Sequence, residues 1–89
     1  MPKELFNVKV INSEKLLFEG QAESVTSVNA EGTFDILPHH TNFISIITKK
    51  LQINLENGKK IQMDIDEGII KCKDNYLNIY LGIKPDQIA

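Results

Sequence analysis

The feature that most constrains the fold is an Asn-Gly pair flanked on both sides by alternating apolar and polar residues. The flanking segments are LQINL at 51–55 and IQMDI at 61–65, around Asn57 and Gly58. Alternation with period two is typical of strands that bury one face. A type I′ turn needs a positive φ at both central residues, which Asn and Gly tolerate. The pattern therefore predicts an antiparallel hairpin over 51–65 with a type I′ turn at Asn57-Gly58.

The same period recurs along nearly the whole chain, and no stretch has the apolar spacing of a helix. Strands are expected at 6–11, 16–19, 21–28, 34–36, 43–47, 51–55, 61–65, 69–72 and 76–81. The pattern predicts an all-β fold, a two-sheet β-sandwich or flattened barrel of about nine to ten short strands. We expect one domain over 1–82 and a short C-terminal tail at 83–89.

Composition limits the classes of function. With 89 residues, 42% apolar and 25% charged, the chain suits a single globular domain. A net charge of −2 without a basic cluster argues against nucleic-acid binding, and no apolar run is long enough for insertion into a membrane. The single cysteine, Cys72, leaves no intramolecular disulfide and no cysteine-based zinc site. We expect a protein of a reducing compartment.

The residues that could carry chemistry do not form a catalytic or metal-binding pattern. His39 and His40 are adjacent, so in extended backbone their side chains point apart, and further metal ligands are not evident. The acidic segment 64–67 lacks the spacing of a calcium loop. The chain has no Gly-x-Ser-x-Gly elbow and no Gly-rich loop before a helix. We therefore expect a non-catalytic protein without a cofactor.

A family resemblance rests on motifs spread over 17–43. Glu-Ser-Val at 23–25 is followed by Glu-Gly at 31–32, Ile-Leu-Pro at 36–38 and His-Thr at 40–41, with Leu-Phe-Glu-Gly upstream at 17–20. In this order and spacing, the motifs resemble the N-terminal β-sandwich of the epsilon subunit of rotary ATP synthases, called delta in mitochondria. The resemblance covers nearly the entire chain.

The sequence departs from this family in its turns and at its end. Val28-Asn29 stands where the family has Pro-Gly, and residues 66–69 keep one glycine of the family's Ser-Gly-Gly-Phe. Most members continue into a helical hairpin that in bacteria can restrain ATP hydrolysis and in some binds ATP. No helical pattern follows Leu81. A natural short form and a truncated chain both fit this pattern, and we expect the former. Without the helical hairpin we expect the protein neither to bind ATP nor to inhibit hydrolysis strongly.

The resemblance implies a non-catalytic subunit of the central stalk, or rotor, of a proton-translocating ATP synthase. Such a subunit couples rotation of the c-ring to the gamma subunit, while catalysis takes place on the alpha and beta subunits. It implies a peripheral location on the cytoplasmic side of the inner membrane of a bacterial cell. The family's ring-facing loop and gamma-facing surface correspond, respectively, to Gly32, Thr33, Pro38 and His40, and to Phe43 and Ile44.

The apolar run at 43–47 offers an independent reason to expect a partner surface. Alternation directs Phe43, Ser45 and Ile47 toward the core and leaves Ile44 and Ile46 outside. An exposed isoleucine pair is a candidate hot spot for a protein contact. The alternative is a free-standing β-sandwich module that binds a small ligand or a peptide, which would have a defined pocket instead.

Overall fold

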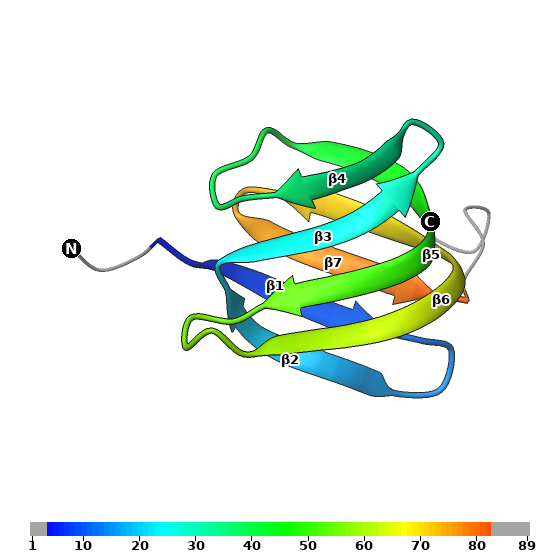
Figure 1. Ribbon diagram of the computed structural model, residues 1–89, viewed down its shortest axis with the longest axis horizontal. Coiled ribbons are helices and arrows are strands. Elements are labelled where there is room, and N and C mark those ends of the chain that lie inside the picture. Colours follow the sequence, from blue (N-terminus) through cyan, green and yellow to red (C-terminus); the bar gives the residue numbers. More distant parts are fainter. Residues whose placement is uncertain (1–3, 83–89) are drawn as a thin grey trace.

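The computed structural model describes residues 4–82, and the elements in that range are seven β-strands and no helix (Figure 1). The strands are β1 (Phe6–Ile11), β2 (Leu16–Ala22), β3 (Ser24–Asn29), β4 (Gly32–Ile36), β5 (Phe43–Asn54), β6 (Lys60–Lys73) and β7 (Tyr76–Leu81). They form one sheet in the order β2-β1-β7-β6-β5-β3-β4, in which β1 and β7 are parallel and the other neighbours antiparallel. The predicted all-β fold is confirmed. The tail predicted at 83–89 lies outside the described residues.

The sheet closes over itself because its two longest strands belong to both layers. β5 has 12 residues and β6 has 14, and both curve round one end of the molecule (Figure 1). The first half of β5 pairs with the second half of β6, beside β7 and β1, whereas the second half of β5 pairs with β3. At the bend the register shifts between Thr48 and Lys49, and Lys49 has a φ of 70°. Such a bulge bends and twists a strand, which allows one sheet to form a sandwich.

The predicted strand number is wrong, since the structure has seven strands instead of nine to ten. Segments 43–47 and 51–55 are one strand, β5, and segments 61–65 and 69–72 are one strand, β6. A bulge interrupts the alternation of residues as a turn does, so the sequence pattern alone suggested a break at each. Gly68 lies inside β6, opposite Ile47 and Leu81.

The predicted hairpin forms, but its turn type differs from the prediction. Gly58 has a φ of 83°, whereas Asn57 is not among the residues with positive φ, so the assignment to type I′ is wrong. The Gly58 N–H donates to the Leu55 carbonyl at 3.1 Å, and the Leu55 N–H donates to the Lys59 carbonyl at 2.8 Å. This arrangement is that of a type I turn closed by a bulge with a left-handed glycine.

The core lies between the two layers and takes residues from every strand. Its buried members are Phe6, Val8, Val10, Ala22, Val25, Ile36, Ile47, Leu51, Ile53, Ile70, Cys72, Leu77, Ile79 and Leu81. Ser27 is buried among them, and its hydroxyl donates to the Lys50 carbonyl at 2.7 Å, beside the bend of β5. This hydrogen bond satisfies a polar group that would be costly to bury alone. Over residues 4–82, no helix has the length and apolar character needed to cross a membrane.

Candidate protein-interaction surfaces

One outer face of the sandwich carries an apolar row that crosses five strands. Register partners along this apolar row are Ile46, Ile69, Tyr80, Ile11 and Leu16. The two ends are exposed, since Ile46 is 49% and Leu16 48% exposed, whereas Ile69, which lies between Ile46 and Tyr80, is 3% exposed. With about 4.8 Å between neighbouring strands, the row is about 19 Å long. Exposed apolar side chains gathered along one face indicate a candidate site for a partner protein.

Ile44 extends the apolar row on β5 and is 64% exposed. Together with Ile46 and the turn at 29–31 it lines a shallow groove of about 520 Å³, here called the isoleucine groove. The predicted alternation is confirmed, because these two isoleucines face outward while Ile47 is fully buried. Phe43 lies on the opposite side of the strand, where it is partly buried against the core. The two residues assigned to the gamma-facing surface therefore point in opposite directions.

The outer face of the other layer is polar and hydrogen-bonded within itself. The Gln62 amide donates to Gln52 Oε1 at 2.5 Å, and the Gln52 amide donates to Asn54 Oδ1 at 2.8 Å. The Asn54 amide in turn donates to the Ser24 hydroxyl at 2.8 Å. These side chains satisfy one another, so this face has no apolar surface comparable with the row on the first face.

The four residues predicted to face the c-ring do not form one cluster. Gly32 and Thr33 begin β4, next to the isoleucine groove, whereas Pro38 and His40 follow the other end of β4 (Figure 1). The strand alone separates the two pairs by about 13 Å. His40 contacts Phe43 instead, with ring centroids 4.8 Å apart and an interplanar angle of 58°. The partner assigned to each pair stays a prediction.

The segment 37–42, here called the corner segment, joins β4 to β5 through a tight turn. The His40 N–H donates to the Leu37 carbonyl at 3.2 Å. Pro38 occupies the second position of this turn, and His39, with a φ of 65°, occupies the third. A proline followed by a residue of positive φ identifies a type II turn. The turn projects two exposed imidazoles from the end of the sandwich.

Two asparagine side chains, which the sequence analysis did not single out, tie the corner segment to the turn between β6 and β7. Asn75 Oδ1 accepts a hydrogen bond from the His39 N–H at 2.7 Å, and Asn42 Oδ1 accepts one from the Asp74 N–H at 2.9 Å. Asp74 and Asn75 have φ values of 52° and 67°, so they form a type I′ turn. The contacts span 36 and 32 residues of sequence, and no local pattern could reveal them.

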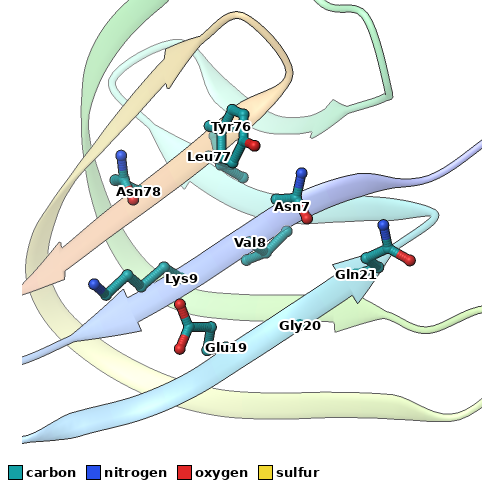
Figure 2. Close-up of a pocket in the computed structure, with 9 residues that line it drawn as sticks. All are labelled: Asn7, Val8, Lys9, Glu19, Gly20, Gln21, Tyr76, Leu77 and Asn78. Atoms are coloured by element: carbon teal, nitrogen blue, oxygen red, sulfur yellow. The ribbon is translucent and has the colours of Figure 1, made fainter.

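A small furrow lies over β1, β2 and β7 (Figure 2). Its lining residues are Asn7, Val8, Lys9, Glu19, Gly20, Gln21, Tyr76, Leu77 and Asn78. Lys9 and Glu19 are register partners on neighbouring strands. The furrow holds about 180 Å³. Pockets for drug-sized ligands typically exceed about 300 Å³ and enclose most of the ligand. The furrow is smaller than this, and the larger isoleucine groove is shallow and open, so neither gives much support to a ligand-binding module.

The residues considered for catalysis or metal binding do not come together in the part of the chain that the structure describes. His39 Nε2 lies 3.5 Å from Glu4 Oε2, and both side chains are exposed. Within residues 4–82, no three side chains of His, Cys, Asp or Glu are placed to hold a metal ion. Cys72 is buried, and burial raises the pKa of its thiol. A raised pKa makes this thiol a poor nucleophile at neutral pH.

Comparison with known proteins identifies the domain type. Residues 5–81 match the family model for the β-sandwich domain of the ATP synthase delta/epsilon chain. An ATP synthase epsilon chain of Leptospira borgpetersenii is 32% identical over 74 residues, which cover 82% of this chain and 58% of that protein. An epsilon chain of Rickettsia typhi is 32% identical over 80 residues, which cover 85% of this chain and 72% of the relative.

The fold recurs in solved structures of much lower sequence identity. A chain of the Euglena gracilis mitochondrial ATP synthase, solved as OSCP/F1/c-ring, superposes with a TM-score of 0.81 at 19% identity, covering 86% of this chain and 50% of the other. A chain of the Tetrahymena thermophila mitochondrial ATP synthase, solved as central stalk and c-ring, superposes with a TM-score of 0.71 at 13% identity. The match covers 100% of this chain and 77% of the other. The present chain spans 58% and 62% of the lengths of two Leptospira epsilon chains.

Proposed function

This chain belongs to the ATP synthase delta/epsilon family, and we propose that it is a non-catalytic subunit of the central stalk, or rotor, of a proton-translocating ATP synthase. In this role it couples rotation of the c-ring to the gamma subunit, and the alpha and beta subunits carry out the chemistry. It is a peripheral protein on the cytoplasmic side of the inner membrane of a bacterial cell. Within this chain we assign residues 1–82 to one domain.

The observation that carries this proposal is the difference between the two outer faces of the sandwich. One face presents the apolar row and the isoleucine groove, and the other is occupied by its own polar hydrogen bonds. Full burial of an isoleucine side chain contributes about 1.5–3 kcal/mol. Because Ile44 is 64% exposed, covering it contributes about 1–2 kcal/mol. The gamma-facing surface is therefore centred on Ile44 and includes Ile46, with Phe43 supporting it from the core side.

Torque transmission requires that the two layers do not slide past each other. β5 and β6 run through both layers, and their ladder continues on each side of the bend. Shear between the layers would therefore have to stretch two continuous strands as well as disrupt the core. This construction suits a domain that turns as one body between the ring and the gamma subunit.

The c-ring contact is proposed at Gly32, Thr33, Pro38 and His40. The exposed imidazole of His40 stands at the corner and is held against Phe43. Gly32 and Thr33 supply a second point of contact at the other end of β4. Two separated polar contacts resist rotation of the domain about either one, which is the requirement for coupling without slip.

The test measures capture of purified gamma subunit and of isolated c-ring by the full 89-residue chain. Ile44→Asp removes the apolar contact and forces a carboxylate to lose its hydration, so we expect capture of gamma to fall at least about 30-fold. Gln62→Asp places the same charge on the polar face, where Gln62 is exposed, and serves as the matched control. His40→Ala should leave gamma capture intact and weaken c-ring capture by a smaller factor, since polar contacts at a rim contribute less.

Circular dichroism of each variant separates loss of contact from loss of fold. If Ile44→Asp stays folded and still captures gamma, the assigned surface is wrong. If Gln62→Asp lowers gamma capture as much as Ile44→Asp does, the difference between the two faces does not determine binding. If the folded wild-type chain captures neither gamma nor the c-ring, the stalk role itself is refuted.

A further inference from the structure

The turn that presents His40 has a geometry that its own residues do not favour. Pro38 at the second position suits type I and type II turns alike. Type II also needs a positive φ at the third position, which glycine or asparagine usually occupies. Here His39 occupies it, with a φ of 65°. A type I turn would give His39 an ordinary negative φ, so a contact outside the turn must select type II.

The side chain of Asn75 makes such a contact. Types I and II differ by a flip of the central peptide, which in this turn joins Pro38 to His39. The flip directs the His39 N–H to opposite sides of the turn in the two types. In the structure this N–H donates to Asn75 Oδ1 at 2.7 Å. A type I turn would direct the same N–H away from Asn75, so the hydrogen bond favours type II alone.

Asn75 is itself fixed from several directions. It lies in the type I′ turn with a φ of 67°, and its carbonyl accepts a hydrogen bond from the Asn7 N–H at 3.2 Å. Its side-chain amide donates to the Leu5 carbonyl at 3.3 Å. The hydrogen bond from the Asp74 N–H to Asn42 Oδ1 holds the other end of the corner segment. The acceptor for His39 is therefore presented by a rigid part of the sandwich.

We propose that Asn75 selects the type II geometry of the turn at 37–40 and is thereby the positioning residue that presents His40 to its partner. The flipped peptide lies directly before His40, so its orientation sets the direction in which the chain delivers this imidazole. The consequence for a partner rests on the proposed function, in which His40 contacts the c-ring. The selection of the turn itself is independent of any partner.

The test compares Asn75→Gly with Asp74→Gly in the full chain. Both substitutions place a glycine where the type I′ turn needs a positive φ, so both preserve the turn between β6 and β7. Asn75→Gly removes the acceptor for His39, whereas Asp74→Gly keeps the backbone N–H that donates to Asn42. Loss of one hydrogen bond should speed exchange of the His39 amide about tenfold.

Nuclear magnetic resonance reports the turn type directly. A residue of positive φ shows a strong nuclear Overhauser effect between its own amide and α protons. We expect His39 to lose this signal in Asn75→Gly and to keep it in Asp74→Gly. Adding His39→Gly to Asn75→Gly should restore the type II turn, because Pro-Gly is its preferred central pair. If His39 keeps a positive φ and its slow exchange in Asn75→Gly, the proposal is overturned.

Capture of isolated c-ring separates this proposal from the proposed function. We expect Asn75→Gly to weaken capture as much as His40→Ala does, and the added His39→Gly to recover it. If His40→Ala weakens capture and Asn75→Gly does not, Asn75 does not position His40. If His40→Ala has no effect, the proposed ring contact fails, and the resonance measurements alone decide whether Asn75 selects the turn.

Discussion

Gly68 is the position where one added methyl group should cost the most stability. A Cβ there would lie 2.9 Å from the Tyr80 carbonyl oxygen, 2.9 Å from Leu81 Cδ2 and 3.4 Å from Ile47 Cγ1. Carbon atoms normally approach to about 3.5–4.0 Å, and the carbonyl belongs to the backbone of a paired strand and cannot move alone. Overpacking destabilises a folded core by about 1–3 kcal/mol. Alanine also reduces the conformational freedom of the unfolded chain, which stabilises the folded state by about 0.4–1 kcal/mol. Gly68→Ala should therefore lower the free energy of unfolding by about 1–2 kcal/mol.

Gly20 provides the matched control, because it is also a strand glycine without a positive φ. A Cβ at Gly20 would lie 3.2 Å from Cζ of Phe18, the far end of a side chain that can shift. We expect Gly20→Ala to change the unfolding free energy by about 0.5 kcal/mol or less. Urea denaturation measures the change in unfolding free energy of both variants, provided that the m value is unchanged. A loss of about 1 kcal/mol corresponds to a fall of about 4–8 °C in melting temperature for a domain of this size. Equal losses at the two glycines, or none at Gly68, would refute the steric argument.

Three further predictions concern turns and titration. Gly58→Val should lower the free energy of unfolding by about 1 kcal/mol or more, because Gly58 has a φ of 83°. The space around Gly58 is open, so the loss would come from backbone strain alone, and an unchanged urea midpoint would contradict it. Lys49→Gly should raise the unfolding free energy by about 0.5 kcal/mol, because the φ of 70° strains any residue with a Cβ; a loss of stability would show that the lysine side chain matters more. Burial raises the pKa of Cys72 above its ordinary 9.0, so the folded state favours the neutral thiol. The stability that the neutral thiol contributes is fully present below the ordinary pKa and is lost as the pH rises through the pKa of the folded state. The free energy of unfolding should therefore fall more steeply with alkaline pH in the wild type than in Cys72→Val.

Alternation in the sequence predicted which side of each strand is buried, because a half-buried strand has no other way to separate apolar from polar side chains. The prediction succeeded for β1, β7 and both halves of β5, including the exposure of Ile44 and Ile46. These features depend on neighbours within a few residues of the same strand. The family resemblance rested likewise on short motifs at fixed spacing, and the match over residues 5–81 confirms it.

The contacts that organise the corner segment depend on residues far apart in the chain, and for that reason the sequence did not predict them. Asn75 lies in the short gap between the expected strands 69–72 and 76–81, yet its side chain reaches His39 and Leu5. The turn at Asn57-Gly58 shows a related limit. Asn-Gly suits a type I′ turn, but it suits equally the last two positions of a type I turn with a left-handed glycine. Which of the two turn types forms depends on the number of residues between the paired strand ends. Alternation in the sequence does not fix that number.

The bulge in β6 is the feature that links the fold most directly to the proposed interaction surface. Before the bend the residues of β6 that pack against the core have odd numbers, such as Ile65, and after it they have even numbers, such as Ile70. Asp66 causes the change, since Thr48 pairs with Glu67 and Lys49 with Ile65, so Asp66 is passed over in the ladder. A shift of one residue moves every later side chain to the other face. If Asp66 took part in the alternation instead of forming a bulge, Ile69 would point into the core, and the apolar row would be interrupted between Ile46 and Tyr80. The same local insertion that closes the sheet into a sandwich therefore also makes its outer apolar row continuous.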